Sequence, residues 1–132
     1  MAYAFKRSGC RGVVMDGLIR DAEDITSHEL PVYCRGVTPV NGARRWGLVE
    51  VGGSIRLPGA GGVAVTVVPG DYVVGDADGV VVIPAAVAGS IIADAEKLAQ
   101  VEQRIAEELQ AGGERSDVFR RNPRFSHIRT VA

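Results

Sequence analysis

The first two thirds of the chain alternate short apolar runs with glycine and proline, a pattern typical of short strands joined by turns. Gly12 to Met15 is a continuous apolar run, which predicts a strand buried on both faces. Residues 18–29 predict a short helix or helical turn. Residues 30–34 predict a strand with Pro31 near its start, where a missing N–H does least harm.

A region rich in glycine and proline follows at residues 36–62, and within it the run from Trp46 to Val51 predicts another strand. Turn-forming proline and glycine then separate three further apolar runs, because these residues fix φ or allow positive φ. The strands predicted from these runs span residues 63–68, 72–76 and 80–84.

After residue 84 the apolar positions recur at helical spacing, at Ile91, Ala95, Leu98, Ile105 and Leu109. This spacing predicts one amphipathic helix of about 25 residues, ended by the glycine pair at 112–113. The tail is expected to pack on the domain or on a neighbouring subunit through its apolar side chains, which are Phe119, Phe125 and Ile128. The predicted architecture is a glycine-rich β layer capped by a C-terminal helix.

The length and composition indicate one globular domain, since 132 residues with 46% hydrophobic content can bury a core. Fifteen basic and sixteen acidic residues leave a net charge of −1, which gives no electrostatic case for a nucleic-acid partner. Cys10 and Cys34 are expected to be reduced, mostly buried thiols of a cytosolic protein. We expect a cytoplasmic protein without a membrane partner, because the N-terminus lacks a signal-peptide core and no apolar run approaches the about 20 residues of a membrane span.

Three charged residues, Asp16, Arg20 and Asp21, follow the first apolar run, and two interpretations of them stay open. In the first, Asp16 forms a turn with Gly17, Asp21 caps a helix, and Arg20 pairs with a surface carboxylate. In the second, these residues hold a metal and an anionic substrate. A hard cation such as Mg²⁺ needs one or two carboxylates and keeps several waters. An arginine beside it offers a planar fork that grips a carboxylate or an enolate oxygen.

Other motifs favour structural interpretations. The GAGGVA run at 59–64 begins like a dinucleotide-binding fingerprint, but a β-branched strand follows it, so a hairpin loop is predicted. His28 and His127 are isolated and are predicted to be surface or interface residues. Asp76 and Asp78 lack the further ligands of an EF-hand loop and are predicted to be turn residues.

Three motifs, in this order, resemble the family of the regulator of ribonuclease activity A. They are GVVMDGLIRD at 12–21, LPVYCRGVTP at 30–39 and VVPGDYVVGDADGVVVIP at 67–84. The family includes the 4-hydroxy-4-methyl-2-oxoglutarate aldolases. The resemblance implies an α/β protein with a swivelling β/β/α, phosphohistidine-domain-like layered fold and a long C-terminal helix. It also implies a ring-shaped homotrimer with active sites between subunits.

In the aldolases of that family, the arginine of the Arg-Asp pair binds the pyruvyl portion of the substrate and the aspartate helps to hold a divalent metal. The resemblance therefore implies that Arg20 binds a small 2-oxo acid and that Asp21 is a ligand of Mg²⁺ or of another divalent metal such as Mn²⁺. The implied reaction is a retro-aldol cleavage that yields pyruvate, accompanied by oxaloacetate decarboxylase activity. The alternative is a non-catalytic, protein-binding regulator of a ribonuclease.

The sequence also departs from the family pattern. The aldolases carry an acidic residue and a substrate-binding glycine loop upstream of the Arg-Asp pair, at positions that would fall before Met1. The first predicted strand likewise begins with no room for a preceding element that covers its second face. We therefore expect residues 1–112 to be the C-terminal portion of a family domain that is N-terminally truncated, with the tail at 113–132 at a subunit interface. A second polypeptide that supplies the remaining half is one expected partner.

Overall fold

The computed structural model describes residues 1–43 and 45–128. The chain divides into two compact units, Met1–Pro84 and Ala85–Ala132. The first unit contains helices and strands, and the second unit is helical. The molecule is thus a small mixed α/β protein with a long C-terminal helix.

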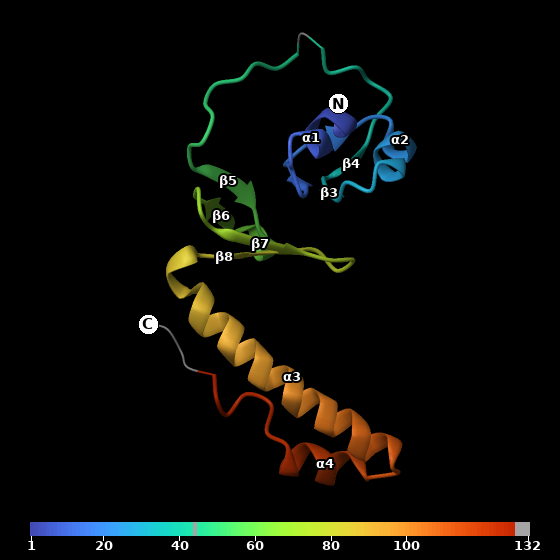
Figure 1. The fold of residues 1–132 in the computed structure, drawn as a ribbon, viewed down its shortest axis with the longest axis vertical. Helices are drawn as coiled ribbons and strands as arrows, with labels where there is room; N and C mark the ends of the chain where they lie inside the picture. Colours follow the sequence, from blue (N-terminus) through green and yellow to red (C-terminus); the bar gives the residue numbers. More distant parts are fainter. Residues whose placement is uncertain (44, 129–132) are drawn as a thin grey trace. The chain divides into compact units, whose positions relative to one another are not determined.

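The first unit begins with two short parallel strand pairs joined by a helix (Figure 1). Strand β1 pairs with β3, and β2 pairs with β4. A helix also precedes the first strand, which corrects the expectation that no element would fit there. The bounds are α1 Ala2–Arg7, β1 Val13–Val14, β2 Leu18–Ile19, α2 Ala22–Ser27, β3 Val32–Tyr33 and β4 Gly36–Val37.

Two antiparallel hairpins complete the first unit. A short 3-10 turn, η1 (Ala60–Gly62), closes the first hairpin, so the hairpin loop predicted at 59–64 is confirmed. The strand predicted from Trp46 to Val51 is wrong, because this run pairs with no strand among the described residues. The hairpin strands are β5 Ile55–Pro58, β6 Ala64–Val67, β7 Tyr72–Gly75 and β8 Val80–Ile83.

The two hairpins differ in how their faces are composed. In β5 and β6 one face is apolar, whereas Arg56 and Thr66 stand opposite each other on the other face. In β7 and β8 every position except Gly75 carries an apolar or aromatic side chain, so both faces of this hairpin are apolar. A strand pair of this composition is typical of a sheet covered on both sides.

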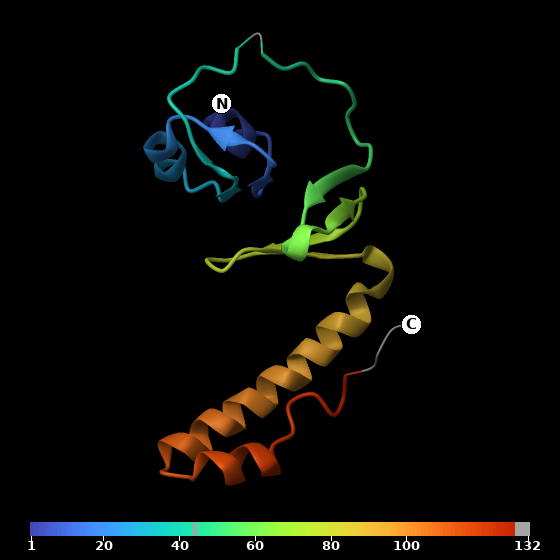
Figure 2. The ribbon, with the colours of Figure 1, turned by 180° about the vertical axis from the view of Figure 1, so that it is seen from behind.

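The second unit is a helical hairpin, in which α4 (Arg115–Arg121) folds back along the end of α3 (Ala88–Gln110), as Figure 2 shows from behind. A 3-10 turn, η2 (Ala85–Val87), precedes α3. The 23 residues of α3 confirm the long helix predicted from the apolar spacing. Gly112, at φ 87°, ends α3, and the N–H of Gly113 donates to the carbonyl of Glu108 at 2.9 Å. This is the Schellman arrangement that favours glycine.

Polar contacts fix the tail on α3. The guanidinium of Arg121 donates to the carboxylate of Glu108 at 2.6 Å and lowers the pKa of that carboxyl, assisted by Asn122. The side chain of Glu114 accepts the N–H of Ser116 at 2.8 Å and so caps α4. His127, predicted to be a surface or interface residue, is half-buried and lies 2.9 Å from the carbonyl of Asp94 through Nε2.

Few apolar side chains are fully enclosed. Among the described residues the buried apolar ones are Ala2, Leu30, Ala88, Ile105 and Val118. The two cysteines are free, as expected, but each is half-buried rather than buried. In the part of the chain that the structure describes, no helix combines the length and apolar character needed to cross a membrane.

Candidate active site

An irregularity in the parallel pairing lies beside the predicted site. Val14 pairs with Tyr33, and the next pair is Leu18 with Gly36. Residues 15–17 of the first segment therefore stand opposite only residues 34–35 of the second. This is the geometry of a β-bulge, which bends a strand and redirects the side chains near it.

Hydrogen bonds resume on both sides of the bulge. The N–H of Met15 donates to the carbonyl of Tyr33 at 2.9 Å, and the N–H of Arg35 donates to the carbonyl of Gly17 at 2.8 Å. Within the bulge, the Nε–H of Arg35 donates to the carboxylate of Asp16. An ion pair therefore links the two segments where the backbone pairing shifts register.

The sequence left Asp16 open between a turn and a part in a metal and substrate site, and it did not single out Arg35. The signal that could have found the pair is the parallel order of the two motifs. GVVMDG and LPVYCRG align as neighbouring strands, which brings the aspartate of one opposite the arginine of the other. Recognising this requires the strand register, which the sequence pattern does not supply.

The second ion pair joins Arg20 and Asp21, which follow β2 directly. The Nε–H of Arg20 donates to Oδ2 of Asp21 at 3.0 Å. The side chains are 46% and 58% exposed, so solvent reaches both. The two ion pairs thus flank β2, one before it and one after it.

Asp21 has an uncommon backbone conformation. Its φ of 61° and ψ of 46° place it in the left-handed region, which aspartate and asparagine tolerate better than other residues with a Cβ. It occupies the N-cap position of α2, yet its side chain makes no capping hydrogen bond. The first interpretation of the sequence, in which Asp21 caps the helix, therefore holds for the position but not for the side chain.

The unused atoms of this pair define what it can bind. Within the described residues, Oδ1 of Asp21 and the two terminal nitrogens of Arg20 make no hydrogen bond. A carboxylate oxygen thus stands beside a guanidinium whose outer edge is open. Such an edge binds a carboxylate through two parallel hydrogen bonds.

The described residues around Asp21 supply only part of the ligand set that a metal ion needs. No group of three or more His, Cys, Asp or Glu side chains gathers within the described ranges. Mg²⁺ is often held by one or two carboxylates together with waters and substrate oxygens, so a single open carboxylate fits it as one ligand. Asp21 is therefore compatible with a metal ligand and does not form a closed site alone.

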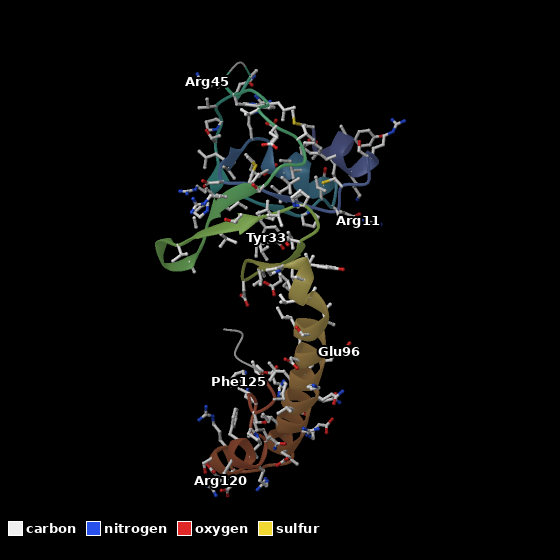
Figure 3. All side chains as sticks on the ribbon, turned by 90° about the vertical axis from the view of Figure 1, so that its left-hand side faces the viewer. Arg11, Tyr33, Arg45, Glu96, Arg120 and Phe125 are labelled. Carbon is white, nitrogen blue, oxygen red and sulfur yellow. The ribbon has the colours of Figure 1, made fainter. Side chains whose placement is uncertain are left out.

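The charged pairs do not line the cavity of the first unit. That cavity has a volume of about 450 Å³ and is bounded mainly by valine, leucine and isoleucine side chains. Arg11 and Tyr33 also line it, and both are marked in Figure 3. Asp16, Arg20 and Asp21 are absent from its wall, so they lie on open surface.

The other predicted residues take structural positions. The N–H of Asp78 donates to Oδ1 of Asp76 at 2.9 Å, and the N–H of Asp76 donates to the carbonyl of Gly79 at 3.0 Å. Both aspartates are turn residues, as predicted. His28 lies 3.7 Å from Asp24 and close to the ring of Tyr3, on the surface of the first unit.

Comparison with known proteins identifies the class. Residues 1–82 match the RraA-like family, described as Aldolase/RraA, and the chain belongs to this family. The resemblance drawn from the three motifs is thereby confirmed.

Individual relatives match most of this chain but only part of themselves. An uncharacterised protein of Methanocaldococcus jannaschii is 37% identical over 86% of this chain and 52% of its own length. A protein of Halalkalibacterium halodurans named "Putative 4-hydroxy-4-methyl-2-oxoglutarate aldolase" is 39% identical over 70% of this chain and 41% of its own. The crystal structure of an uncharacterised protein from Pseudomonas syringae pv. tomato matches with a TM-score of 0.80 and 28% identity, over 92% of this chain and 55% of that one. The chain thus spans about half the length of the curated relatives just described.

Proposed function

We propose that this chain carries the metal- and substrate-binding part of a divalent-metal-dependent aldolase that cleaves 4-hydroxy-4-methyl-2-oxoglutarate-type acids to pyruvate. The observation that carries the proposal is the Arg20–Asp21 pair, with its open guanidinium edge and an unused carboxylate oxygen. Membership of the RraA-like family and the relative named for the same reaction support it. On the same ground we propose the swivelling β/β/α layering and a trimeric assembly.

The reaction breaks the C3–C4 bond of the substrate. The C4 hydroxyl loses its proton and becomes a ketone, while the bonding electrons pass to C3 and form the enolate of pyruvate. Protonation of C3 then releases a second pyruvate. Decarboxylation of oxaloacetate passes through the same enolate, so it would accompany the aldolase activity.

Arg20 and Asp21 have separate tasks in this reaction. The terminal N–H groups of Arg20 bind the carboxylate and the adjacent oxygen of the 2-oxo acid, where negative charge develops. Asp21 holds the divalent metal, which when bound supplies Lewis-acid polarisation of the 2-oxo group. The hydrogen bond from Nε of Arg20 to Oδ2 of Asp21 would hold the guanidinium beside the metal ligand.

The exposure of the pair sets a further requirement. An enolate needs a site from which bulk water is excluded, because water weakens every electrostatic interaction that stabilises it. With Arg20 46% and Asp21 58% exposed, residues from another chain or segment must cover the pair during catalysis. The base that takes the C4 hydroxyl proton would come from there as well.

The test is release of pyruvate from 4-hydroxy-4-methyl-2-oxoglutarate, with and without Mg²⁺, by the chain together with the unmatched part of the Halalkalibacterium halodurans relative, which would supply the cover and the base. Wild type should release pyruvate only with the metal, and Asp21→Asn should lose at least 100-fold, in line with the loss of one electrostatic group in an active site, about 10²–10³. Thr66→Asp, which changes an exposed residue on the polar face of the hairpin β5/β6, is the control and should keep the wild-type rate. Equal rates for wild type and Asp21→Asn would remove Asp21 from the mechanism and would favour the regulator alternative.

A further inference from the structure

The parallel strand pair β2/β4 has an arginine at each of its two ends. Arg20 follows β2 directly, and Arg35 directly precedes β4. Each donates from Nε to a carboxylate next to β2, Arg20 to Asp21 and Arg35 to Asp16. Within the described ranges neither guanidinium has a second partner, so both keep terminal N–H groups for a ligand. The arrangement that makes Arg20 a candidate for binding an anion is therefore present twice.

The strand register sets the separation of the two arginines. Leu18 pairs with Gly36, so Arg20 lies three residues further along the parallel pair than Arg35. Steps of about 3.3 Å along the strands and a spacing of about 4.8 Å between them place the two Cα atoms about 11 Å apart. The separation follows from hydrogen-bonded strands of the first unit, so the placement of the two units does not affect it.

The proposed substrate carries a negative charge at each end. Arg20 and the metal at Asp21 account for its C1 carboxylate and its 2-oxo group, whereas the C5 carboxylate has no partner in that scheme. Because the site must be covered from bulk water during catalysis, an unpaired carboxylate there would be costly. The two carboxylate carbons of a five-carbon chain are roughly 5 Å apart. Two arginine side chains at the separation of Arg20 and Arg35 can reach both ends of such a chain.

The charge balance of the site also favours a dianion. Arg20 with Asp21, and Arg35 with Asp16, are two neutral pairs. A divalent metal adds two positive charges, which a dicarboxylate neutralises and a monocarboxylate compensates only by half. Uncompensated charge is unfavourable in a site from which water is excluded. These residues therefore suit a 2-oxo acid that has a second carboxylate.

We propose that Arg35 binds the distal carboxylate of a 2-oxo dicarboxylic acid whose 2-oxo end lies at Arg20 and Asp21. Asp16 holds Nε of Arg35 and leaves its terminal N–H groups to the substrate, which they bind through two parallel hydrogen bonds. This inference rests on the proposed function. It adds the residue that distinguishes dicarboxylate from monocarboxylate substrates.

The experiment compares two 2-oxo acids, 2-oxoglutarate and 2-oxopentanoate, which differ only in that a methyl group replaces the distal carboxylate. Neither has the C4 hydroxyl that the retro-aldol reaction needs, so both measure binding without turnover. Isothermal titration calorimetry of the 132-residue chain at a fixed concentration of Mg²⁺ gives the two dissociation constants. Wild type should bind 2-oxoglutarate about tenfold more tightly, in line with a charge-assisted hydrogen bond.

Four variants assign this preference to a residue. Arg35→Gln should weaken the binding of 2-oxoglutarate until the two dissociation constants are nearly equal, while 2-oxopentanoate binds as before and so reports a folded site. Arg20→Gln should weaken the binding of both acids. Arg56→Gln makes the same charge change at an exposed position on the polar face of β5/β6 and should keep the preference. Asp16→Asn should keep it as well, because the guanidinium of Arg35 remains.

The last variant separates substrate binding from a purely structural role. If the ion pair only stabilised the strands, Asp16→Asn and Arg35→Gln would act alike and would weaken the binding of both acids. That result would overturn the proposal. So would equal affinities in wild type, or a preference that survives Arg35→Gln. Wild type that binds neither acid would contradict the proposed function itself, so the two failures are distinguishable.

Discussion

Replacing Asp21 in turn by asparagine, glycine and alanine separates the role of its carboxylate from the strain of its backbone. Its φ of 61° lies in the left-handed region, which costs a residue with a Cβ roughly 1–2 kcal/mol. Asparagine tolerates this region as aspartate does, glycine adopts it freely, and alanine does neither. The ion pair with Arg20 is exposed and contributes at most about 1 kcal/mol.

The expected stabilities follow from these magnitudes. Asp21→Asn should change the local free energy of opening by less than about 1 kcal/mol. Asp21→Ala should lower it by about 1–2 kcal/mol, and Asp21→Gly should leave it equal or raise it. Hydrogen exchange of the α2 amides measures this locally, because the N–H of Ile25 donates to the carbonyl of Asp21 at 3.0 Å.

Activity should follow a different order from stability. All three variants remove the proposed metal ligand, so pyruvate release should be lost in each, including the glycine variant that is as stable as wild type. If asparagine destabilises α2 as much as alanine does, the left-handed backbone of residue 21 does not set the stability of this helix. If the asparagine variant keeps its activity, the carboxylate has no part in the reaction.

Three further predictions concern packing and pH. Gly113→Ala would place a Cβ 2.7 Å from the carbonyl oxygen of Glu108 and should destabilise the helical hairpin by about 1–3 kcal/mol. Gly89→Ala, with open space around it, should instead stabilise α3 by about 0.5–1 kcal/mol. Thermal unfolding followed by circular dichroism measures both changes. Gly75→Ala would meet the ring of Tyr33 at 2.6 Å and should increase exchange of the β7 amides, while an unchanged exchange rate would disprove the contact. The pKa of Glu108 is lowered from its ordinary 4.5 by the hydrogen bond from Arg121, so its carboxylate stabilises the hairpin at neutral pH, and this contribution is lost as the pH falls below 4.5 through the folded pKa. Glu108→Gln should therefore lower the melting temperature at pH 7 and make little difference near pH 2; an equal difference at both pH values would contradict the assignment.

The elements with strong local signals could be predicted from the sequence. The Asp78-Gly79 turn between two valine-rich runs predicts the hairpin β7/β8, and the apolar spacing after residue 84 predicts α3. In both cases the pattern and the turn chemistry act within a few residues of one another. Gly112 and Gly113 likewise mark the end of α3 in the sequence itself.

Elements that depend on distant contacts could not be predicted from the sequence. Helix α1 has a contact with a residue distant in the sequence, because the ammonium of Lys6 donates to the carbonyl of His28 at 2.7 Å. The run from Trp46 to Val51 has strand composition, but a strand forms only when a partner pairs with it. Strand β5 lies in the region rich in glycine and proline, where the sequence pattern predicts no strand at these residues. Its pairing with β6 decides its conformation.

The candidate site shows the same division. Arg20 and Asp21 are adjacent in the sequence, so the resemblance to the family could single them out. The link between Asp16 and Arg35 depends on a one-residue shift of register between parallel strands. The sequence also does not predict the left-handed conformation of Asp21. Nor does it predict that Asp21 occupies the N-cap position without a capping hydrogen bond from its side chain.

The most direct test of the central claim is a titration of the chain with Mn²⁺ in the presence of pyruvate, followed by water-proton relaxation. Bound Mn²⁺ enhances the relaxation of its remaining waters, so the signal reports metal uptake without any turnover. Wild type should bind the metal, and pyruvate should change the signal as it displaces water. Asp21→Asn should abolish binding, and Arg20→Gln should keep the metal but lose the effect of pyruvate. Identical titrations for wild type and Asp21→Asn would contradict the account.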